Sequence, residues 1–330
     1  MNQKNLTLLE EILQGNRRAM AKAITLQEST NPKTFEQGQE LLDSLFPHTG
    51  RALRIGITGV PGVGKSTFIE AFGLYLIEIG HRVAVLAVDP SSPITGGSIM
   101  GDKTRMKDLS QHPDSFIRPS PSSGILGGVA RKTRETILIC EAAGYDIVFV
   151  ETVGVGQSEI QVDSMVDLFM LLILPNSGDE LQGIKKGVLE IADLIVVNKS
   201  DGVQEAQAIN TQSEYRKAMQ LLSSSKNSWD PQILLCSALE KKGLDKIWEG
   251  VKYFQESLKN SGEWDQQRRS QSEKWMWTLV EEGLFNNFRK NESVKKTIPE
   301  LEKIVASGEI LPANAASKLL EIWQTSKNIS

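Results

Sequence analysis

The sequence contains few of the residues that build disulfide frameworks or metal clusters. Its 330 residues include two cysteines and three histidines. Cys140 and Cys236 are too few for a disulfide framework, and their positions in regular segments are typical of small buried hydrophobic residues. The histidines are scattered, so no metal-ligand spacing arises. These absences argue against a disulfide scaffold and against a zinc or nickel site.

The chain also lacks a long apolar run and an excess of positive charge. Its most apolar stretch, Val166–Leu174, is far shorter than the ~20 residues that span a bilayer. The first residues lack the basic and apolar regions of a secretory signal. The formal net charge is −4, whereas proteins that bind nucleic acid usually carry a basic face. We therefore expect a cytosolic, cytoplasmic protein that binds neither membrane nor nucleic acid.

Three parts of the chain differ in their hydrophobic pattern, and we predict them as three domains. Residues 1–50 show helical spacing of apolar residues, broken at Asn31–Pro32, and form an N-terminal helical extension. Residues 51–258 alternate short apolar runs with longer amphipathic segments. Residues 259–330 have helical patterns punctuated by glycine and proline, with no strand. Three helices are predicted there, at Gln266–Phe288, Val294–Ser307 and Ala313–Trp323, punctuated by Gly283, Pro299, Gly308 and Pro312.

The middle part has the pattern of a doubly wound α/β domain. Its apolar runs are rich in valine, isoleucine and leucine with little alternation, as in strands buried on both faces of a parallel sheet. Six strands are predicted, at Leu53–Thr58, Val83–Val88, Ile147–Val150, Leu168–Leu174, Leu194–Val197 and Ile233–Leu235. Crossover helices are predicted at Lys65–Ile79, Gly127–Ala143 and Val203–Leu222. The predicted fold class is α/β, with a mostly parallel sheet flanked by N- and C-terminal helices.

A phosphate-binding loop follows the first apolar run. Residues 59–66 read GVPGVGKS and fit the pattern G-x-x-x-x-G-K-[ST] between a strand and a helix. The glycines let backbone N–H groups surround phosphate, and the helix adds its positive end. Lys65 is predicted to reach the β- and γ-phosphates, and the Ser66 hydroxyl to ligate Mg²⁺. The nucleotide-binding residues predicted here are Gly59, Val60, Pro61, Gly62, Val63, Gly64, Lys65, Ser66 and Thr67.

Two later motifs predict recognition of guanine. Residues 198–201 read NKSD after a predicted strand, and fit the N-K-x-D pattern. The Asp201 carboxylate can accept hydrogen bonds from both guanine N1–H and the 2-amino group, whereas adenine offers no such pair. Ser237, Ala238 and Leu239 follow the next strand, where a loop of this kind braces the base. We predict that Asn198, Lys199 and Asp201 bind GTP with these three residues.

Acidic residues at other strand ends are candidates for Mg²⁺ and catalysis. Asp89 ends the second predicted strand, Asp102 lies in a glycine- and serine-rich loop, and Glu151 ends the third strand. For both aspartates, a helix cap or turn is the alternative. Gly154 is predicted to place a backbone N–H near the γ-phosphate, and Gln157 either orients water or caps a helix. The predicted metal ligands are Ser66, Asp89, Asp102 and Glu151, and the predicted catalytic residues are Lys65, Glu151 and Gln157.

These motifs together resemble the MeaB/MMAA family, also described as ArgK-like. The likeness extends over nearly the whole chain, and the runs 96–106 and 178–185 are more specific than the phosphate loop. The segments that carry it are Gly59–Thr67, Val88–Ser92, Gly96–Met106, Glu151–Ser158, Gly178–Lys185, Asn198–Gly202 and Trp275–Ala316. One departure is Asn176–Ser177, where the family often has smaller residues.

The resemblance implies a homodimeric GTPase that assists another enzyme. The partner implied is an adenosylcobalamin-dependent acyl-CoA mutase, usually methylmalonyl-CoA mutase. The GTPase would gate the loading of the mutase cofactor and the protection and reactivation of the mutase. The C-terminal helical region would supply the dimer contact. The Mg²⁺ environment of the family includes positions matching Ser66, Asp89 and Asp102. A switch that responds to the mutase is implied at Asp179, Glu180, Gln182 and Lys185.

Three other functions compete with this one. A nickel metallochaperone GTPase of the same class would require a histidine-rich tract or a Cys/His site to bind nickel, and this chain lacks both. An ATP-dependent kinase is suggested by the ArgK description, but the NKSD motif argues against it. A module that holds nucleotide without turnover is the third alternative. Measurements of GTP and ATP binding and of GTP hydrolysis distinguish them.

Overall fold

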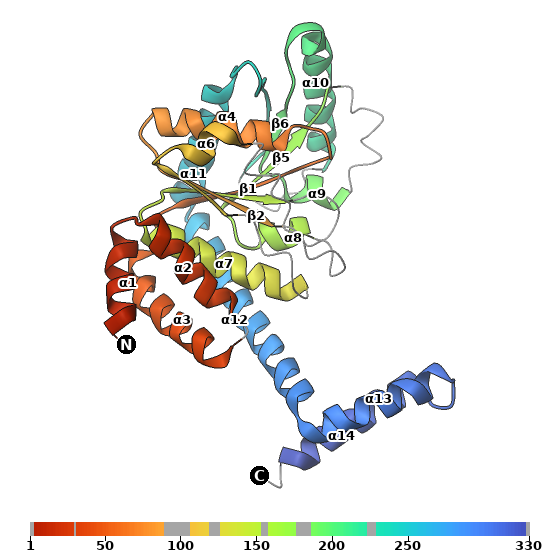
Figure 1. Ribbon diagram of the computed structural model, residues 1–330. Helices are drawn as coiled ribbons and strands as arrows, with labels where there is room; N and C mark the ends of the chain where they lie inside the picture. The colour runs from red at the N-terminus through yellow and green to blue at the C-terminus, as the bar shows by residue number, and fades with distance from the viewer. Residues whose placement is uncertain are drawn as a thin grey trace. The chain divides into compact units, whose positions relative to one another are not determined.

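One parallel β-sheet forms the centre of the fold in the computed structural model (Figure 1). The strand order is β3-β2-β4-β1-β5-β6-β7, and all neighbouring pairs are parallel. The strands are β1 (Leu53–Gly59), β2 (Val83–Val88), β3 (Ser115–Arg118), β4 (Ile147–Thr152), β5 (Leu168–Ile173), β6 (Leu194–Val197) and β7 (Gln232–Leu235). The structure describes residues 3–29, 31–88, 106–118, 126–152, 158–175, 186–222 and 229–327. The predicted α/β fold with a parallel sheet is confirmed.

The strand order places a topological switch point at β1. This strand lies between β4 and β5, in register at Ile57 with Glu151 and at Gly59 with Leu172. After β1, the chain forms β2, β3 and β4 on one side of this strand. It then forms β5, β6 and β7 on the other side. In open α/β sheets, ligands bind outside the carboxyl ends of strands at such a point. The loop after Gly59 therefore begins where a ligand is expected.

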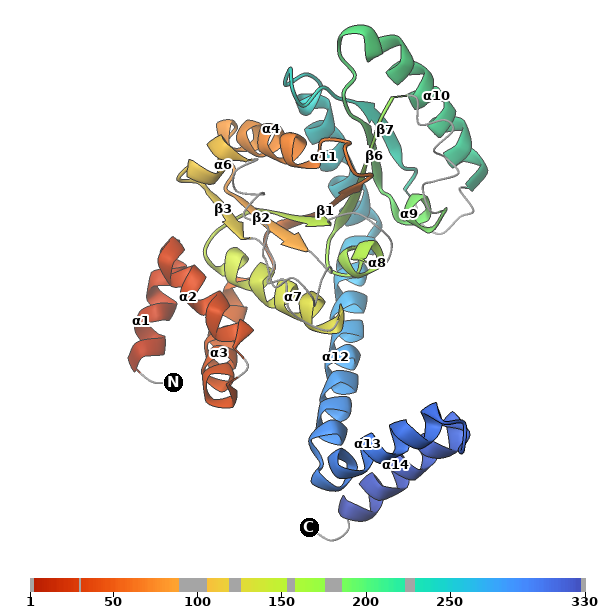
Figure 2. The same ribbon diagram turned by 45° about the vertical axis from the view of Figure 1, so that its right-hand side comes forward.

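Helices cover both faces of the sheet (Figure 2). On one face, α4 (Lys65–Glu78), α6 (Lys107–Gln111) and α11 (Leu244–Ser261) share a core with the strands. Stacked rings of Phe68, Phe72 and Phe149 lie in this core. The other face is covered by α7 (Leu126–Ala142), α8 (Ser158–Asp163), α9 (Lys186–Ile191) and α10 (Glu205–Leu222). The strands are buried on both faces, as their near-continuous apolar runs predict.

The N-terminal extension is helical, as predicted, but it has one more break between helices than the single break predicted at Asn31–Pro32. The described helices are α1 (Gln3–Leu13), α2 (Arg17–Glu28), α3 (Pro32–Leu45) and the short 3-10 helix η1 (Phe46–His48). The unforeseen break lies between α1 and α2, where Gly15 adopts φ +78° and the Asn16 side chain caps α2. Asn31 caps α3, with Pro32 in its first turn, at the predicted break.

Buried polar groups join this extension to helix α7. Gln39 donates to Gln27 at 2.7 Å and to the Glu135 carboxylate at 3.3 Å. Arg131 donates to the same carboxylate at 2.9 Å, and its guanidinium lies 4.7 Å from the centre of the Phe35 ring. Burial raises the pKa of Glu135, and the Arg131 charge opposes that shift. The extension thus packs on the sheet domain through polar contacts to Glu135 Oε1 as well as apolar contacts.

Strand β3 and the helices α6, α8, α9 and α11 escaped the sequence analysis. Strand β3 has four residues, with serine and arginine at its ends, so it shows no apolar run. Helix α11 lies in a segment that was assigned to the α/β domain without a helix of its own. The predicted helices Gln266–Phe288 and Val294–Ser307 are confirmed as α12 (Glu263–Lys290), which contains Gly283, and α13 (Glu292–Ala306), which contains Pro299. Both cysteines are buried, as predicted.

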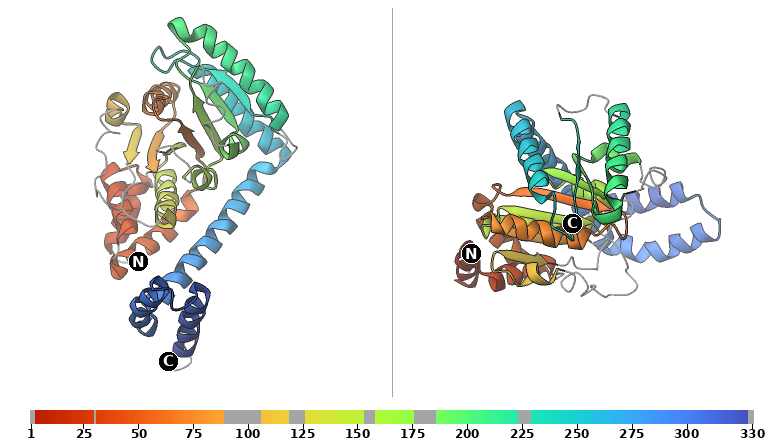
Figure 3. Two further views of the ribbon diagram at one scale, coloured as in Figure 1. Left: turned by 90° about the vertical axis from the view of Figure 1, so that its right-hand side faces the viewer. Right: turned by 90° about the horizontal axis from the view of Figure 1, so that it is seen from above.

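The chain divides into two compact units, residues 1–268 and 269–330. Helix α12 begins in the first unit, and its later part belongs to the second with α13 and α14 (Pro312–Lys327). Within the second unit, α13 and α14 lie side by side (Figure 3). The exposed apolar residues of this unit include Met276, Trp277, Val280, Leu284 and Phe285. Among the described helices, none is long and apolar enough to cross a membrane.

Candidate nucleotide-binding site

The phosphate loop adopts backbone angles that favour glycine. Gly59, Gly62 and Gly64 have φ values of +156°, +82° and +91°. A Cβ on Gly59 would lie 2.5 Å from the carbonyl oxygen of Leu172 on β5, so a side chain cannot fit there. A Cβ on Gly64 would lie 3.0 Å from Nδ2 of Asn198. The pattern of glycines in the motif therefore matches the space and the backbone angles that the loop requires.

The loop leads into a helix whose first turn is open to an anion. Gly64 is the N-cap of α4, and it supplies no side chain to the N–H groups of the first turn. Lys65, Ser66 and Thr67 form that turn and are partly or fully exposed. Uncapped N–H groups and the helix dipole both favour a phosphate at this place. The observed loop and helix fit the phosphates of a nucleotide.

Lys65 is held back against the loop in this structure. Its ammonium group donates a hydrogen bond of 2.7 Å to the Gly59 carbonyl oxygen. Burial lowers the pKa of Lys65, while the nearby carboxylates of Glu151 and then Glu159 act in the opposite direction. Glu151 and Glu159 are 6% and 4% exposed. Glu159 was missed by the sequence analysis, because its burial appears only in the structure.

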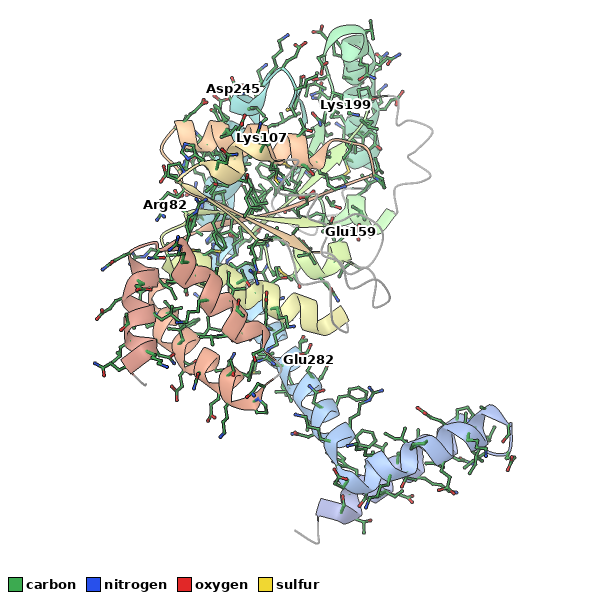
Figure 4. All side chains as sticks on the ribbon, viewed as in Figure 1. Arg82, Lys107, Glu159, Lys199, Asp245 and Glu282 are labelled. Carbon is green, nitrogen blue, oxygen red and sulfur yellow. The ribbon has the colours of Figure 1, made fainter. Side chains whose placement is uncertain are left out.

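Asn198 connects the phosphate loop with the base-binding loop. Its side chain is buried, donates to the Val63 carbonyl oxygen at 2.9 Å and accepts from the Ala238 N–H at 3.1 Å. Lys199, with φ +59°, donates from Nζ to the Gly62 carbonyl oxygen at 2.9 Å (Figure 4). The structure thus brings three motifs that are far apart in the sequence to one edge of the sheet.

Asp201 and the loop after β7 complete the base side of the site. Asp201 precedes the short 3-10 helix η3 (Gly202–Gln204), and within that described turn no N–H donates to its carboxylate. Ser237 is fully buried, and its hydroxyl accepts from the Glu240 N–H at 3.1 Å. Ala238 is buried, whereas Leu239 is 79% exposed. The Asp201 carboxylate is therefore not used to cap the turn, the common alternative role of such a residue.

Replacing Asn198 by alanine is expected to weaken binding of GDP by roughly tenfold. The change leaves the Val63 carbonyl and the Ala238 N–H without their partner, and each buried group costs ~1–3 kcal/mol when unsatisfied. Part of that cost will appear as loss of stability rather than of affinity. Titration with fluorescent GDP and a thermal melt measure the two effects. Asn210→Ala, at an exposed position of α10, is the control, and equal affinities of the two variants would contradict the expectation.

Two of the predicted Mg²⁺ ligands lie in the described site. Ser66 is in the first turn of α4, and Glu151 is at the end of β4 near the charge of Lys65. A hydroxyl and a carboxylate are hard oxygen donors of the kind that Mg²⁺ prefers, so these residues fit the ion. Thr152 next to Glu151 donates to the Thr58 hydroxyl at 2.7 Å, which joins the ends of β4 and β1. Strand β2 ends at Val88, in register with Thr152.

The remaining predicted site residues lie outside the described residues. They are Asp89, Asp102, Gly154, Gln157, Asp179, Glu180, Gln182 and Lys185. In the part of the chain that the structure describes, no group of three or more His, Cys, Asp or Glu side chains is arranged to hold a metal ion. The roles of these eight residues stay predictions.

Comparisons with known proteins agree with the geometry of the site. Residues 20–293 match the family model described as methylmalonyl Co-A mutase-associated GTPase MeaB. A protein of Mycobacterium tuberculosis named as a probable GTPase is 54% identical over 93% of this chain and 92% of its own length. The mitochondrial methylmalonic aciduria type A homolog of Mus musculus is 46% identical over 95% of this chain and 78% of its own length.

A solved structure shares the fold at high coverage. The crystal structure named LAO/AO transport system kinase superposes with a TM-score of 0.77 and 40% identity, over 98% of this chain and 99% of that one. The family match at residues 20–293 includes the phosphate loop and the NKSD motif. The chain belongs to the MeaB family of P-loop GTPases.

Proposed function

We propose that this GTPase acts, with Mg²⁺, as a chaperone of an adenosylcobalamin-dependent acyl-CoA mutase, specifically methylmalonyl-CoA mutase. It would gate loading of the cofactor and its protection or reactivation. The observation that carries the proposal is the match of residues 20–293 to a family described as associated with that mutase. The joined phosphate and base loops around Asn198 support the guanine-nucleotide part.

The described residues suggest how the nucleotide is held. The backbone of residues 59–67 surrounds the phosphates, and Lys65 leaves the Gly59 carbonyl to contact them. Asp201 receives the guanine edge, and the loop 237–239 braces the base. Ser66 and Glu151, together with Asp89 and Asp102, are proposed to hold Mg²⁺, which neutralises charge that develops on the phosphates. Glu151 and Gln157 are proposed to orient the attacking water, with Gly154 at the γ-phosphate.

The C-terminal region is proposed to form a homodimer contact. Exposed apolar side chains of α12, among them Met276, Trp277 and Val280, repeat at spacings of one helical face. An apolar helix face in water is stabilised when a second surface covers it. The proposal includes three domains, at residues 1–50, 51–258 and 259–330. It also includes a cytoplasmic location. Residues 179–185 are proposed to respond to the mutase.

The test is GTP hydrolysis by the purified protein, alone and with methylmalonyl-CoA mutase from the same genome. We expect slow turnover that rises at least several-fold when the mutase is added, because a bound partner can complete the water-positioning groups. Another acyl-CoA mutase and an unrelated cobalamin enzyme serve as controls. Turnover that ignores the mutase would refute the partner and leave the GTPase. Tight GTP binding without turnover would favour a module that only holds nucleotide.

A further inference from the structure

Two threonine hydroxyls are buried where the neighbouring strands β1 and β4 end. Thr58 and Thr152 are 2% and 0% exposed, and the Thr152 hydroxyl donates to the Thr58 hydroxyl at 2.7 Å. Strand β4 is apolar from its start up to Val150. Valine has nearly the same shape as threonine and would fill this space without burying two polar groups. Packing alone therefore does not account for threonine at both positions.

The hydroxyl bond extends the contact between the two strands beyond their backbone pairing. The register of β1 with β4 ends at Ile57 and Glu151, and the two threonines are the next residues along each strand. On their other sides the same strands stay paired for longer, β1 with β5 up to Gly59 and β4 with β2 up to Thr152. The bond thus joins β1 and β4 at the carboxyl edge of the sheet, one residue after their backbone register has ended.

Each threonine adjoins a part of the proposed reaction site. Thr58 immediately precedes Gly59, where the phosphate loop begins, and Thr152 immediately follows Glu151. Successive side chains of a strand point to opposite faces, so the threonines lie on the face of Gly56, where α8 packs, and Glu151 lies on the other face. A hydroxyl pair on that face influences Glu151 and the loop through the strand backbones, not by touching a nucleotide.

We propose that Thr58 and Thr152 are positioning residues for GTP hydrolysis, whose hydroxyl bond fixes the end of β4 against the start of the phosphate loop. The proposal rests on the proposed roles of Mg²⁺ and Glu151 in that reaction. A misplacement of reacting groups by about 1 Å can cost roughly 10²-fold in rate. One bond that sets the distance between two strand ends therefore affects turnover more than it affects binding of nucleotide.

The test is GTP hydrolysis by the full chain at saturating GTP and Mg²⁺, with Thr58→Val, Thr152→Val and the double variant. We expect each single change to lower kcat roughly tenfold, while the affinity for fluorescent GDP stays within about twofold. The double variant should be no slower than the single variants, because the same bond is lost in all three. Its melting temperature should lie within about 4 °C of the natural value, since replacing both partners by apolar groups of the same shape is nearly neutral.

Two further variants separate the hydroxyl bond from packing. Thr152→Ser keeps the hydroxyl and loses only a methyl group, so it should retain most of the natural kcat. Thr136→Val is the matched control, because it removes another buried threonine hydroxyl, which donates to the Lys132 carbonyl oxygen within α7. This control should leave kcat unchanged.

The proposal is wrong if the valine variants at Thr58 and Thr152 turn over GTP as fast as Thr136→Val, or if the two single effects multiply in the double variant. A loss of GDP affinity as large as the loss of kcat would show that the pair maintains the loop rather than its position. A natural protein that hydrolyses no GTP would refute the proposed function and this role together, whereas normal turnover in every variant overturns the role alone. If thermal melting shows that the double variant is unfolded, Thr58→Ala and Thr152→Ala, which remove the hydroxyl without adding an atom, are measured with the same expectations.

Discussion

Replacing Arg268 by methionine is expected to lower the free energy of unfolding by about 3–5 kcal/mol, because it strands a buried carboxylate. Arg268 Nε and Nη2 donate to the two carboxylate oxygens of Asp167, each at 2.7 Å. The Asp167 side chain is 1% exposed. Arg268 also donates to the carbonyls of Gly50 and Ala52 and lies over the Trp264 ring. The substitution removes all of these contacts while keeping a long apolar stem.

Urea unfolding followed by circular dichroism measures this effect. Arg269→Met is the matched control, since the neighbouring arginine is exposed and its loss should change the free energy of unfolding by less than ~0.5 kcal/mol. The double variant Arg268→Met, Asp167→Asn should recover part of the loss, because the buried charge is then gone. Equal stabilities of Arg268→Met and Arg269→Met would show that the ion pair contributes nothing net.

The strands and the nucleotide motifs could be predicted from the sequence because local patterns determine them. Strands β2, β5 and β6 are unbroken apolar runs, and the phosphate loop, the NKSD motif and the loop 237–239 each follow a predicted strand. The parallel sheet then brings together residues as distant in sequence as Val63 and Asn198, since the carboxyl ends of its strands share one edge. A chain with this pattern has few other ways to bury its strands.

Other features depend on tertiary contacts that leave little trace in the sequence. Strand β3 is short and polar at its ends, and it forms because β2 offers it a partner. Glu159 belongs to no motif, and its burial appears only when α8 is folded against β1. Such features are set by burial and packing rather than by a recognisable sequence pattern.

Replacing Asp201 by asparagine is expected to weaken GTP binding by roughly 10²–10³-fold, which corresponds to about 3–4 kcal/mol. The carboxylate accepts from two adjacent donors of guanine, and an amide can accept from only one. Xanthine carries a carbonyl in place of the 2-amino group, and the asparagine N–H can donate to it while its oxygen accepts from N1–H. The variant should therefore bind xanthosine triphosphate more tightly than GTP. Competition against fluorescent GDP measures the affinities for GTP and for xanthosine triphosphate.

The gain for xanthosine triphosphate makes this prediction more informative than a simple loss. A damaged fold lowers affinity for every nucleotide, whereas an exchanged hydrogen-bond pattern moves the preference from one base to another. Asp230→Asn, at an exposed position beyond α10, is the control and should keep the preference for GTP. If Asp201→Asn still prefers GTP, the carboxylate does not read the base. If the natural protein prefers ATP, the kinase alternative gains support, because adenine lacks the donor pair of guanine and Asp201 would then not select the base.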